Sequence, residues 1–153
     1  MMKSKKIVFL LLFSLGLLYY GDVKTSVRYE MANNNIPTPD NQSSLGKSVA
    51  NGKELYTDFC VTCHLSNGKG DGANFPPLAG SNWLKEKRSQ SIYAVKFGQS
   101  GPIIVNGKKF NNSMTDMGLT DKEVADVLNY VMNTWGNKQT KMITIDEVLK
   151  IKQ

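Results

Sequence analysis

The pentapeptide Cys60-Val-Thr-Cys63-His64 contains both cysteines and the only histidine of this 153-residue chain. Residues three positions apart face the same side of a helix, so both thiols can bond to one planar ligand. His64 follows Cys60 at i+4 on that same face, where a ring nitrogen can reach a metal at the centre of the ligand. This is the C-x-x-C-H pattern of covalent haem attachment. It predicts one haem bonded to Cys60 and Cys63, with His64 as the proximal iron ligand.

Two other chemistries use a pair of cysteines at this spacing. A structural zinc ion needs four nitrogen or sulfur ligands, whereas the cysteines and histidine of the chain offer three. A thioredoxin-like redox pair follows a strand, whereas the stretch from Ser48 to His64 has its apolar residues at helical spacing. A chance motif beside a core histidine is disfavoured, because all three residues fall within five positions. The residues therefore favour haem.

The sixth coordination position of a haem iron decides what the protein can do. A second histidine ligand is excluded within this chain, so a methionine is the expected partner. After residue 44 there are four candidates, Met114, Met117, Met132 and Met142. Met132 falls in a predicted helix and Met142 in the C-terminal tail, where we expect methionine to fill the core. Met114 and Met117 lie in an irregular segment that can carry a side chain over the ring.

The N-terminus has the composition of a targeting segment. A cationic stretch, residues 1–6, precedes an apolar run of 15 residues from Ile7 to Gly21, which is the order found in secretory signals. The run is shorter than the ~17–25 residues that span a bilayer comfortably. We therefore expect residues 1–21 to be a signal peptide or an N-terminal membrane anchor, with residues 7–21 as the tether. The remainder of the chain is then periplasmic.

The charge of the chain belongs largely to this leader. The formal net charge is +6, but residues 22–153 hold 16 basic and 13 acidic residues, which leaves +3. A surplus this small does not indicate a nucleic-acid partner. Residues 22–44 are polar and contain Pro37 and Pro39, so we expect a flexible linker there. The main domain is predicted over residues 45–137, followed by a tail, residues 138–153.

The periodicity of the domain predicts an all-α protein. We expect one helix from Ser48 to His64, a second in the latter half of residues 83–97, and an irregular segment at residues 100–115. The sequence Thr120-Asp-Lys-Glu123 is a capping box that opens a helix ending before Gly136. The same pattern at residues 144–147 opens a short final helix in the tail. Three to four short helices with loops this long become reasonable when a large cofactor completes the core.

Several motifs beyond the pentapeptide resemble those of class I c-type cytochromes. They are Gly68-Lys-Gly-Asp-Gly72, Phe75-Pro-Pro-Leu-Ala-Gly-Ser81, Met114 before Leu119-Thr-Asp121, the helix from Asp121 to Tyr130, and Trp135-Gly-Asn137. Their order is similar to that of small bacterial monohaem cytochromes that serve, or are fused to, periplasmic dehydrogenases and reductases. The resemblance spans residues 45–137. It implies the cytochrome c fold, a haem c enclosed by helices, a proximal histidine and a distal methionine.

The resemblance also implies roles for particular residues. The spacing to the following helix implies Met114 as the distal ligand and Met117 as an apolar packing residue. The family usually has a proline after the ligand, where this chain has Thr115, so Met117 stays as the second choice.

Three more residues of the haem pocket follow from the resemblance. The carbonyl group of Pro76 is implied as the acceptor of the His64 ring N–H, which fixes the tautomer of the ring. Leu78 is implied to pack on the haem, and Trp83 to line the haem or to meet a propionate. Each of these three residues also has an ordinary structural role as a turn proline, a core leucine or a core tryptophan.

An iron bound by His64 and a methionine has no position left for a substrate. We therefore expect a one-electron carrier that cycles between Fe(II) and Fe(III), not an enzyme in its own right. Its expected donor is a dehydrogenase or quinol-oxidising complex, and its acceptor a terminal reductase or oxidase. One alternative is a dedicated cytochrome c subunit of a dehydrogenase, reductase or oxidase complex. Another is a haem sensor or peroxidase with a labile sixth ligand.

Overall fold

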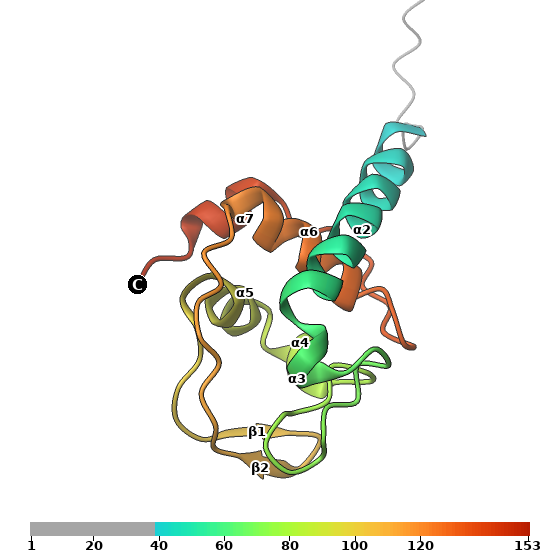
Figure 1. The fold of residues 1–153 in the computed structure, drawn as a ribbon. Coiled ribbons are helices and arrows are strands. Elements are labelled where there is room, and N and C mark those ends of the chain that lie inside the picture. Colours follow the sequence, from blue (N-terminus) through green and yellow to red (C-terminus); the bar gives the residue numbers. More distant parts are fainter. Residues whose placement is uncertain (1–38) are drawn as a thin grey trace, which may run out of the picture. The chain divides into compact units, whose positions relative to one another are not determined.

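The computed structural model describes residues 39–153, so the predictions for the leader and for residues 22–38 lie outside the described residues. Six helices and one hairpin make up the described chain (Figure 1). They are α2 (Pro39–Phe59), α3 (Val61–His64), α4 (Asn82–Glu86), α5 (Arg88–Phe97), β1 (Ile103–Val105), β2 (Lys108–Phe110), α6 (Asp121–Val131) and α7 (Ile145–Lys150). None of these helices is both long and apolar enough to cross a membrane.

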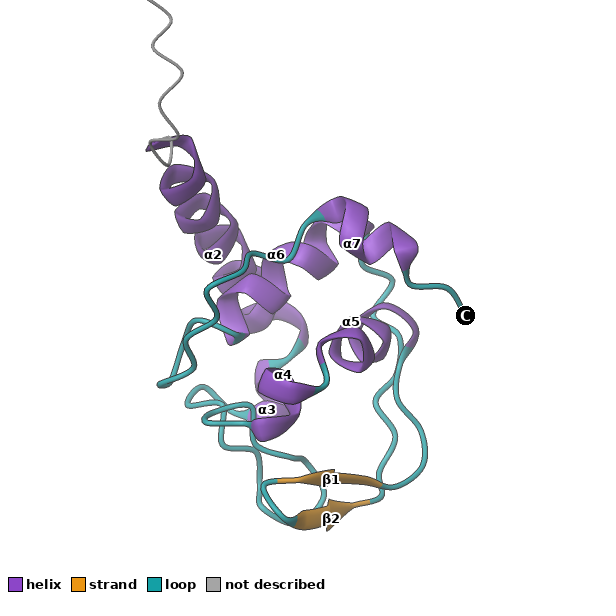
Figure 2. Ribbon diagram, turned by 180° about the vertical axis from the view of Figure 1, so that it is seen from behind, coloured by secondary structure: helices purple, strands orange, loops and turns teal. Residues whose placement is uncertain are grey.

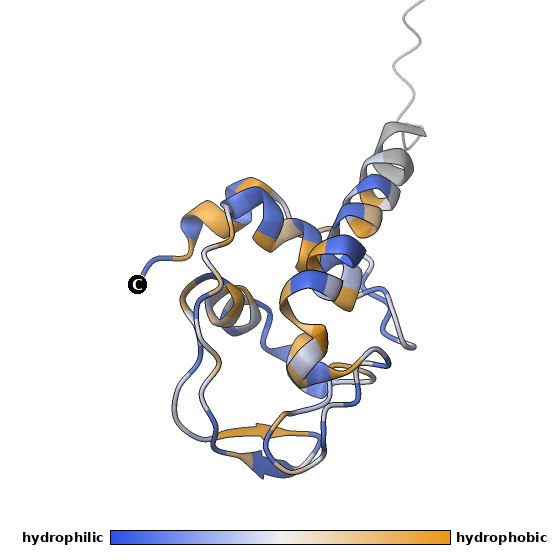
Figure 3. Ribbon diagram, viewed as in Figure 1, coloured by the Kyte–Doolittle hydropathy of each residue, from blue (hydrophilic) through white to orange (hydrophobic). Residues whose placement is uncertain are grey.

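Helices α2 and α6 pack against each other (Figure 2). A Cβ atom at Gly52 of α2 would lie 2.0 Å from the carbonyl oxygen of Asp126 in α6, so only glycine permits this approach. The core beside the contact consists of Tyr56, Val124, Val127, Leu128 and Val131, all buried. Hydrophobic and hydrophilic residues alternate along α2, α6 and α7 (Figure 3), as expected for helices with one buried face.

The predicted capping box at the start of α6 is present. The Thr120 side chain accepts the N–H of Glu123, and the Glu123 carboxylate accepts the N–H of Thr120. The helix ends at Val131, however, and not just before Gly136. Trp135 therefore lies outside the helix, with a left-handed φ of 52°, and packs on Tyr56 at a ring distance of 5.0 Å.

The segment at residues 100–115, predicted as irregular, contains the antiparallel hairpin β1–β2. Asn106 and Gly107 form its turn with φ values of 49° and 77°, and positive φ at both positions is the geometry that Asn-Gly favours in hairpins. Each strand is three residues long, too short to show an alternating pattern. Val105 and Phe110 are buried, whereas Ile104 is 62% exposed.

The helices also begin and end differently from the prediction. The helix predicted over residues 48–64 starts at Pro39, within the predicted linker, and proline is well suited to a first helical position. It is interrupted only at Cys60, where φ is −117°, between α2 and α3. Residues 82–86 are helical too, because the Ser81 side chain caps α4 by accepting the N–H of Leu84. Six helices therefore stand where three or four were predicted.

The tail folds back on the rest of the domain. Ile143 and Val148 are fully buried in the same core cluster as the residues of α6. The short helix after Thr144 forms as predicted, and Thr144 caps it by accepting the N–H of Glu147. Figures 1 and 2 show the hairpin at the opposite end of the body from α7.

Candidate functional site

One large, mainly apolar cavity lies among these elements, and every helix and strand of residues 39–153 except α7 lines it. Its wall brings together all eight residues singled out from the sequence, which are Cys60, Cys63, His64, Pro76, Leu78, Trp83, Met114 and Met117. Met132, by contrast, is buried in the core outside the cavity wall, and Met142 is absent from the wall as well. The structure thus narrows the methionine candidates to two.

The imidazole of His64 is held by one defined contact. Its side chain is 9% exposed, and its Nδ1 atom lies 3.1 Å from the carbonyl oxygen of Pro76. Burial lowers the pKa of His64, and the hydrogen bond to Pro76 opposes that shift. A neutral ring that donates its Nδ1–H keeps a lone pair on Nε2. The ring is therefore set up to act as a metal ligand through Nε2.

The loop between His64 and Pro76 depends on a close backbone approach. Gly70 has a φ of 61°, and a Cβ there would lie 2.2 Å from the carbonyl oxygen of Phe75. Its N–H donates to the carbonyl oxygen of His64 at 3.0 Å. The Asp71 carboxylate accepts backbone N–H groups of residues 73–75, and these bonds lower the pKa of its carboxyl group. This folding brings the carbonyl group of Pro76 to the imidazole.

The two cysteines lie at the cavity wall and are not joined in a disulfide. Burial, together with the neighbouring Cys63, raises the pKa of the Cys60 thiol to about 11. Within residues 39–153, no three side chains of His, Cys, Asp or Glu are grouped so that they could hold a metal ion by themselves. The donor set suits a planar apolar group that is bonded through two thiols and ligated by one imidazole.

The backbone of Met114 is fixed by a contact with the end of α5. It forms an isolated antiparallel bridge with Gln99, with two N–H···O distances of 2.8 Å. Gly98, whose φ is 86°, makes room for the bridge, because a Cβ there would lie 2.7 Å from the carbonyl oxygen of Met114. Met117 also lines the cavity, but no backbone bridge holds it in the described residues.

Sequence reasoning missed part of the cavity wall. The hairpin contributes Ile103, Val105 and Phe110, and α5 contributes Ala94 and Val95. The hairpin could have been found from Asn106-Gly107, whose turn preference is strong. No local signal in the sequence marks which face of α5 meets the cavity.

Comparisons with known proteins decide the family. The model of the Cytochrome c family matches residues 49–135. The chain belongs to the cytochrome c family. It is similar to a cytochrome c-552 of Thermus thermophilus, with 36% identity over 117 residues, 71% of this chain and 78% of the relative. A second cytochrome c-552 of the same species is 37% identical over 112 residues, 67% of this chain and 85% of the relative.

Longer relatives share only part of their length with this chain. The cytochrome c subunit of a quinone-dependent alcohol dehydrogenase from Gluconobacter oxydans is 32% identical over 108 residues, 66% of this chain but 22% of the relative. A gluconate 2-dehydrogenase cytochrome c subunit from Pantoea cypripedii is 28% identical over 115 residues, 71% of this chain and 25% of the relative. These matches confirm the predicted all-α cytochrome c fold, the single covalent haem c and the role in electron transfer.

Proposed function

We propose that this class I cytochrome is a one-electron carrier with His64 as the proximal and Met114 as the distal iron ligand. The observation that carries the proposal is that one apolar cavity is lined by both thiols, His64 and Met114. When bound, the haem supplies the Fe(II)/Fe(III) couple. With both axial positions taken by the protein, no site remains for a substrate at the iron.

The residues of the chain tune that couple. The Pro76 carbonyl group accepts the Nδ1–H of His64, which fixes the ring orientation and raises the basicity of the other nitrogen. A thioether from Met114 favours Fe(II), and together with the apolar wall it gives a higher potential than two imidazoles would. Leu78 and Trp83, also in the wall, are proposed to pack against the haem and keep water away from it.

The choice of Met114 over Met117 is supported by the backbone. Two hydrogen bonds to Gln99 fix the position of Met114, whereas among residues 39–153 the loop around Met117 has only a local hydrogen bond, from the Gly118 N–H to the Asp116 carboxylate. A ligand on a fixed backbone loses less entropy when it binds the iron. Met117 is therefore assigned to apolar packing.

The sequence identities favour a separate carrier over an enzyme subunit, because they are 36% and 37% with the c-552 cytochromes but 26–32% with the dehydrogenase subunits. The matched region makes up 78% and 85% of the two c-552 cytochromes, but 22–26% of the dehydrogenase subunits. The second candidate, a dedicated cytochrome c subunit of a dehydrogenase, reductase or oxidase complex, rests on those longer matches. Purification from the native host separates the two, because a subunit stays with a larger catalytic chain and a carrier does not.

The proposed location and redox partners of the carrier rest on the sequence. We propose that residues 1–21 direct export to the periplasm, as a cleaved signal or as a retained anchor. The donor is then a dehydrogenase or a quinol-oxidising complex, and the acceptor a terminal reductase or oxidase. Mass spectrometry of the protein purified from the host measures whether the leader is still attached.

Optical spectra of the haem-loaded protein test the ligand assignment. We expect reduced bands of haem c, a far-red methionine–iron band in the oxidised state, and no response of the reduced protein to CO. Met114→Leu should abolish the far-red band and allow CO to bind, whereas Met117→Leu should leave both properties unchanged. The opposite pattern would assign Met117 instead. CO binding by the unaltered protein would overturn the carrier proposal in favour of a sensor or peroxidase.

A further inference from the structure

The segment that carries Met114 contacts the C-terminal end of α5 at two points. Met114 is bridged to Gln99, just beyond the C-terminal end of α5. Asp121, the first residue of α6, pairs with Lys96 in the last turn of α5, with an Nζ–Oδ1 distance of 2.8 Å. Residues 96–99 therefore hold the methionine segment, residues 114–121, at both of its ends.

The ammonium group of Lys96 makes three polar contacts within the protein. Its side chain is only 15% exposed. Besides Asp121, its ammonium group donates to the carbonyl oxygens of Val148 at 3.0 Å and Ile151 at 3.4 Å. An ammonium group has three donors, so these three acceptors match its capacity. One side chain thus joins α5, the start of α6 and the end of α7.

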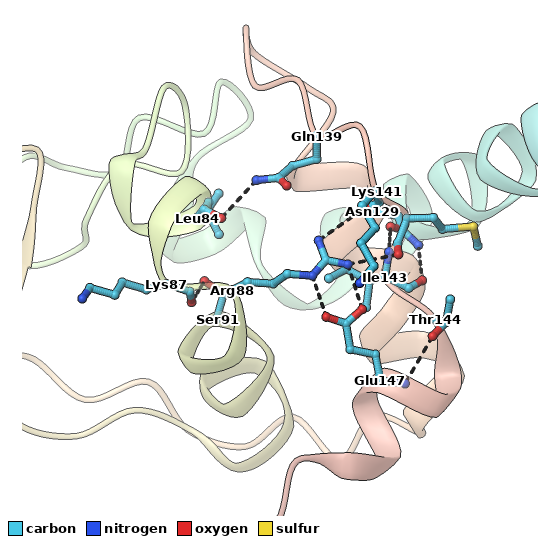
Figure 4. A network of polar contacts seen from close by, with 11 residues as sticks. Leu84, Lys87, Arg88, Ser91, Asn129, Gln139, Lys141, Ile143, Thr144 and Glu147 are labelled. Carbon is cyan, nitrogen blue, oxygen red and sulfur yellow. Dashed lines mark hydrogen bonds and ion pairs between the residues drawn. The ribbon is translucent and has the colours of Figure 1, made fainter.

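The C-terminal tail, which lies beyond the residues matched by the family model, contacts α5 at both of its ends. Arg88, at the first position of α5, forms two hydrogen bonds with Glu147 of α7 and one each with the carbonyl groups of Lys141 and Met142 (Figure 4). The tail is therefore bound to α5 at its first residue and again at Lys96. The family model ends at residue 135, so two of the three acceptors of Lys96, the carbonyl groups of Val148 and Ile151, lie beyond it.

Between its two anchors the methionine segment has no regular secondary structure. Segments of this kind open locally at low free-energy cost unless contacts at their ends hold them. Opening would carry the thioether of Met114 away from the iron. Keeping the segment closed therefore depends on the Gln99 bridge and on the ion pair of Lys96 with Asp121.

We propose that Lys96 is a positioning residue for Met114, and that the C-terminal tail keeps Lys96 in place by accepting two of its hydrogen bonds. Through this junction the tail governs how often the sixth position of the iron is vacant. The proposal rests on the proposed function, in which Met114 is the distal ligand. Lys96 itself is absent from the cavity wall. It can therefore act on the iron only through Met114, by changing how often that residue occupies the sixth position.

Lys96→Met tests the proposal in the full-length, haem-loaded protein. Hydrogen bonds to charged groups are strong enough for us to expect a roughly tenfold rise in the rate of CO binding to the reduced protein. The far-red methionine–iron band should disappear at a lower temperature than the helical circular dichroism. Lys96→Arg keeps the charge and several donors, so it should stay close to the unaltered protein.

Lys122→Met is the matched control. Lys122 also pairs with an aspartate of α6, Asp126, at 2.5 Å, but it contacts neither α5 nor the methionine segment in the described chain. We expect this variant to lower the unfolding temperature without changing the rate of CO binding. If Lys96→Met behaves in the same way, Lys96 has only a structural role and the proposal is wrong.

Two further variants distinguish a failure of this proposal from a failure of the assignment of Met114 as the distal ligand. If Lys96→Met fails to take up haem, Asp121→Asn removes only one of the three partners and should raise CO binding to a smaller extent. An unchanged CO rate in Asp121→Asn would then contradict the proposal. If Met114→Leu leaves the far-red band in place, the distal-ligand assignment is the part that fails, whatever Lys96 does.

Discussion

Arg88 and Glu147 form a two-point ion pair, with 2.6 Å between Nε and Oε1 and 2.8 Å between Nη2 and Oε2 (Figure 4). Glu147 occupies the position at which a capping box would return its carboxylate to the N–H of Thr144. Its carboxylate is directed to Arg88 instead, so the cap of α7 is half formed and the helix is tied to α5. Glu147 thus forms a long-range ion pair with Arg88 in place of the local hydrogen bond to Thr144 that the capping-box motif predicts.

Glu147→Gln tests the contribution of this pair to stability and its dependence on pH. The Arg88 side chain holds the pKa of Glu147 below its usual range. A carboxyl group of this kind stabilises the fold above its unfolded pKa of about 4.3, and the contribution is lost as the pH falls through the folded pKa. We expect the variant to lose about 1 kcal/mol of unfolding free energy at neutral pH. Urea unfolding should show that this difference shrinks in acid.

Asp146→Asn is the control for that experiment, because Asp146 lies in the same turn of α7 and forms no ion pair with the described residues. Its effect should be small and should not follow the titration of Glu147. An acid-insensitive loss in Glu147→Gln would contradict the assignment to the ion pair.

Tyr56→Phe tests a contact next to the haem-binding motif. The buried Tyr56 hydroxyl donates to the carbonyl oxygen of Leu65 at 2.6 Å. Leu65 has φ 62° and ψ 161°, a region that is almost confined to glycine and costs other residues about 1–3 kcal/mol. Without the hydroxyl, we expect about 1–2 kcal/mol less unfolding free energy, measured in urea.

Tyr130→Phe provides the comparison, since Tyr130 packs in the same aromatic cluster, 5.5 Å from Tyr56 between ring centroids. Its hydroxyl has no hydrogen bond among the described residues, so its removal should cost little. Equal losses in the two variants would show that ring packing, and not the bond to Leu65, sets the stability.

Asn129→Ala tests how the tail is joined to the core. The buried Asn129 side chain donates to the Ile143 carbonyl oxygen at 3.0 Å and accepts the Ile143 N–H at 2.8 Å. Alanine leaves both backbone groups buried without these partners, and we expect a loss of about 3 kcal/mol in urea unfolding. Asn133→Ala, which removes only a bond to the Asn129 carbonyl oxygen, should cost about 1 kcal/mol. A small effect at Asn129 would mean that the tail is held mainly by its apolar residues.

The sequence was most informative where a function needs residues close together in the chain. Cys60 caps α3 and His64 ends it, four positions later, and the capping box of Thr120 is complete within four residues. Contacts between distant residues were not predictable in this way. Arg88 and Glu147 are 59 residues apart, and no local pattern in the sequence indicates that they pair.

The hairpin shows a second reason why the sequence did not predict the whole fold. Its turn residues, Asn106 and Gly107, favour a hairpin, but strands of three residues are too short to show the alternation that would predict them. The position of Met114 depends on this neighbourhood, because the chain leaves the hairpin at Phe110 and then returns to pair with Gln99. The preference for Met114 over Met117 as the distal ligand therefore came from a resemblance and not from the local pattern.

Gly98→Ala tests whether the bridge to Met114 sets the distal ligand. A Cβ at residue 98 would lie 2.7 Å from the carbonyl oxygen of Met114, and its φ of 86° already disfavours alanine. Gly101→Ala is the matched control, because Gly101 has a similar φ of 81° with nothing within 4 Å of the added Cβ. Both variants should lose about 1 kcal/mol through backbone strain.

Only Gly98→Ala should also push the Met114 backbone away from Gln99, because its added Cβ meets a backbone atom that cannot rotate away. We expect that variant alone to weaken the far-red methionine–iron band and to admit CO to the reduced protein. The optical spectra of the two variants, recorded beside their urea unfolding curves, separate strain from displacement. If both variants keep the band, the bridge is not what places the methionine, and the segment reaches the iron by its own packing.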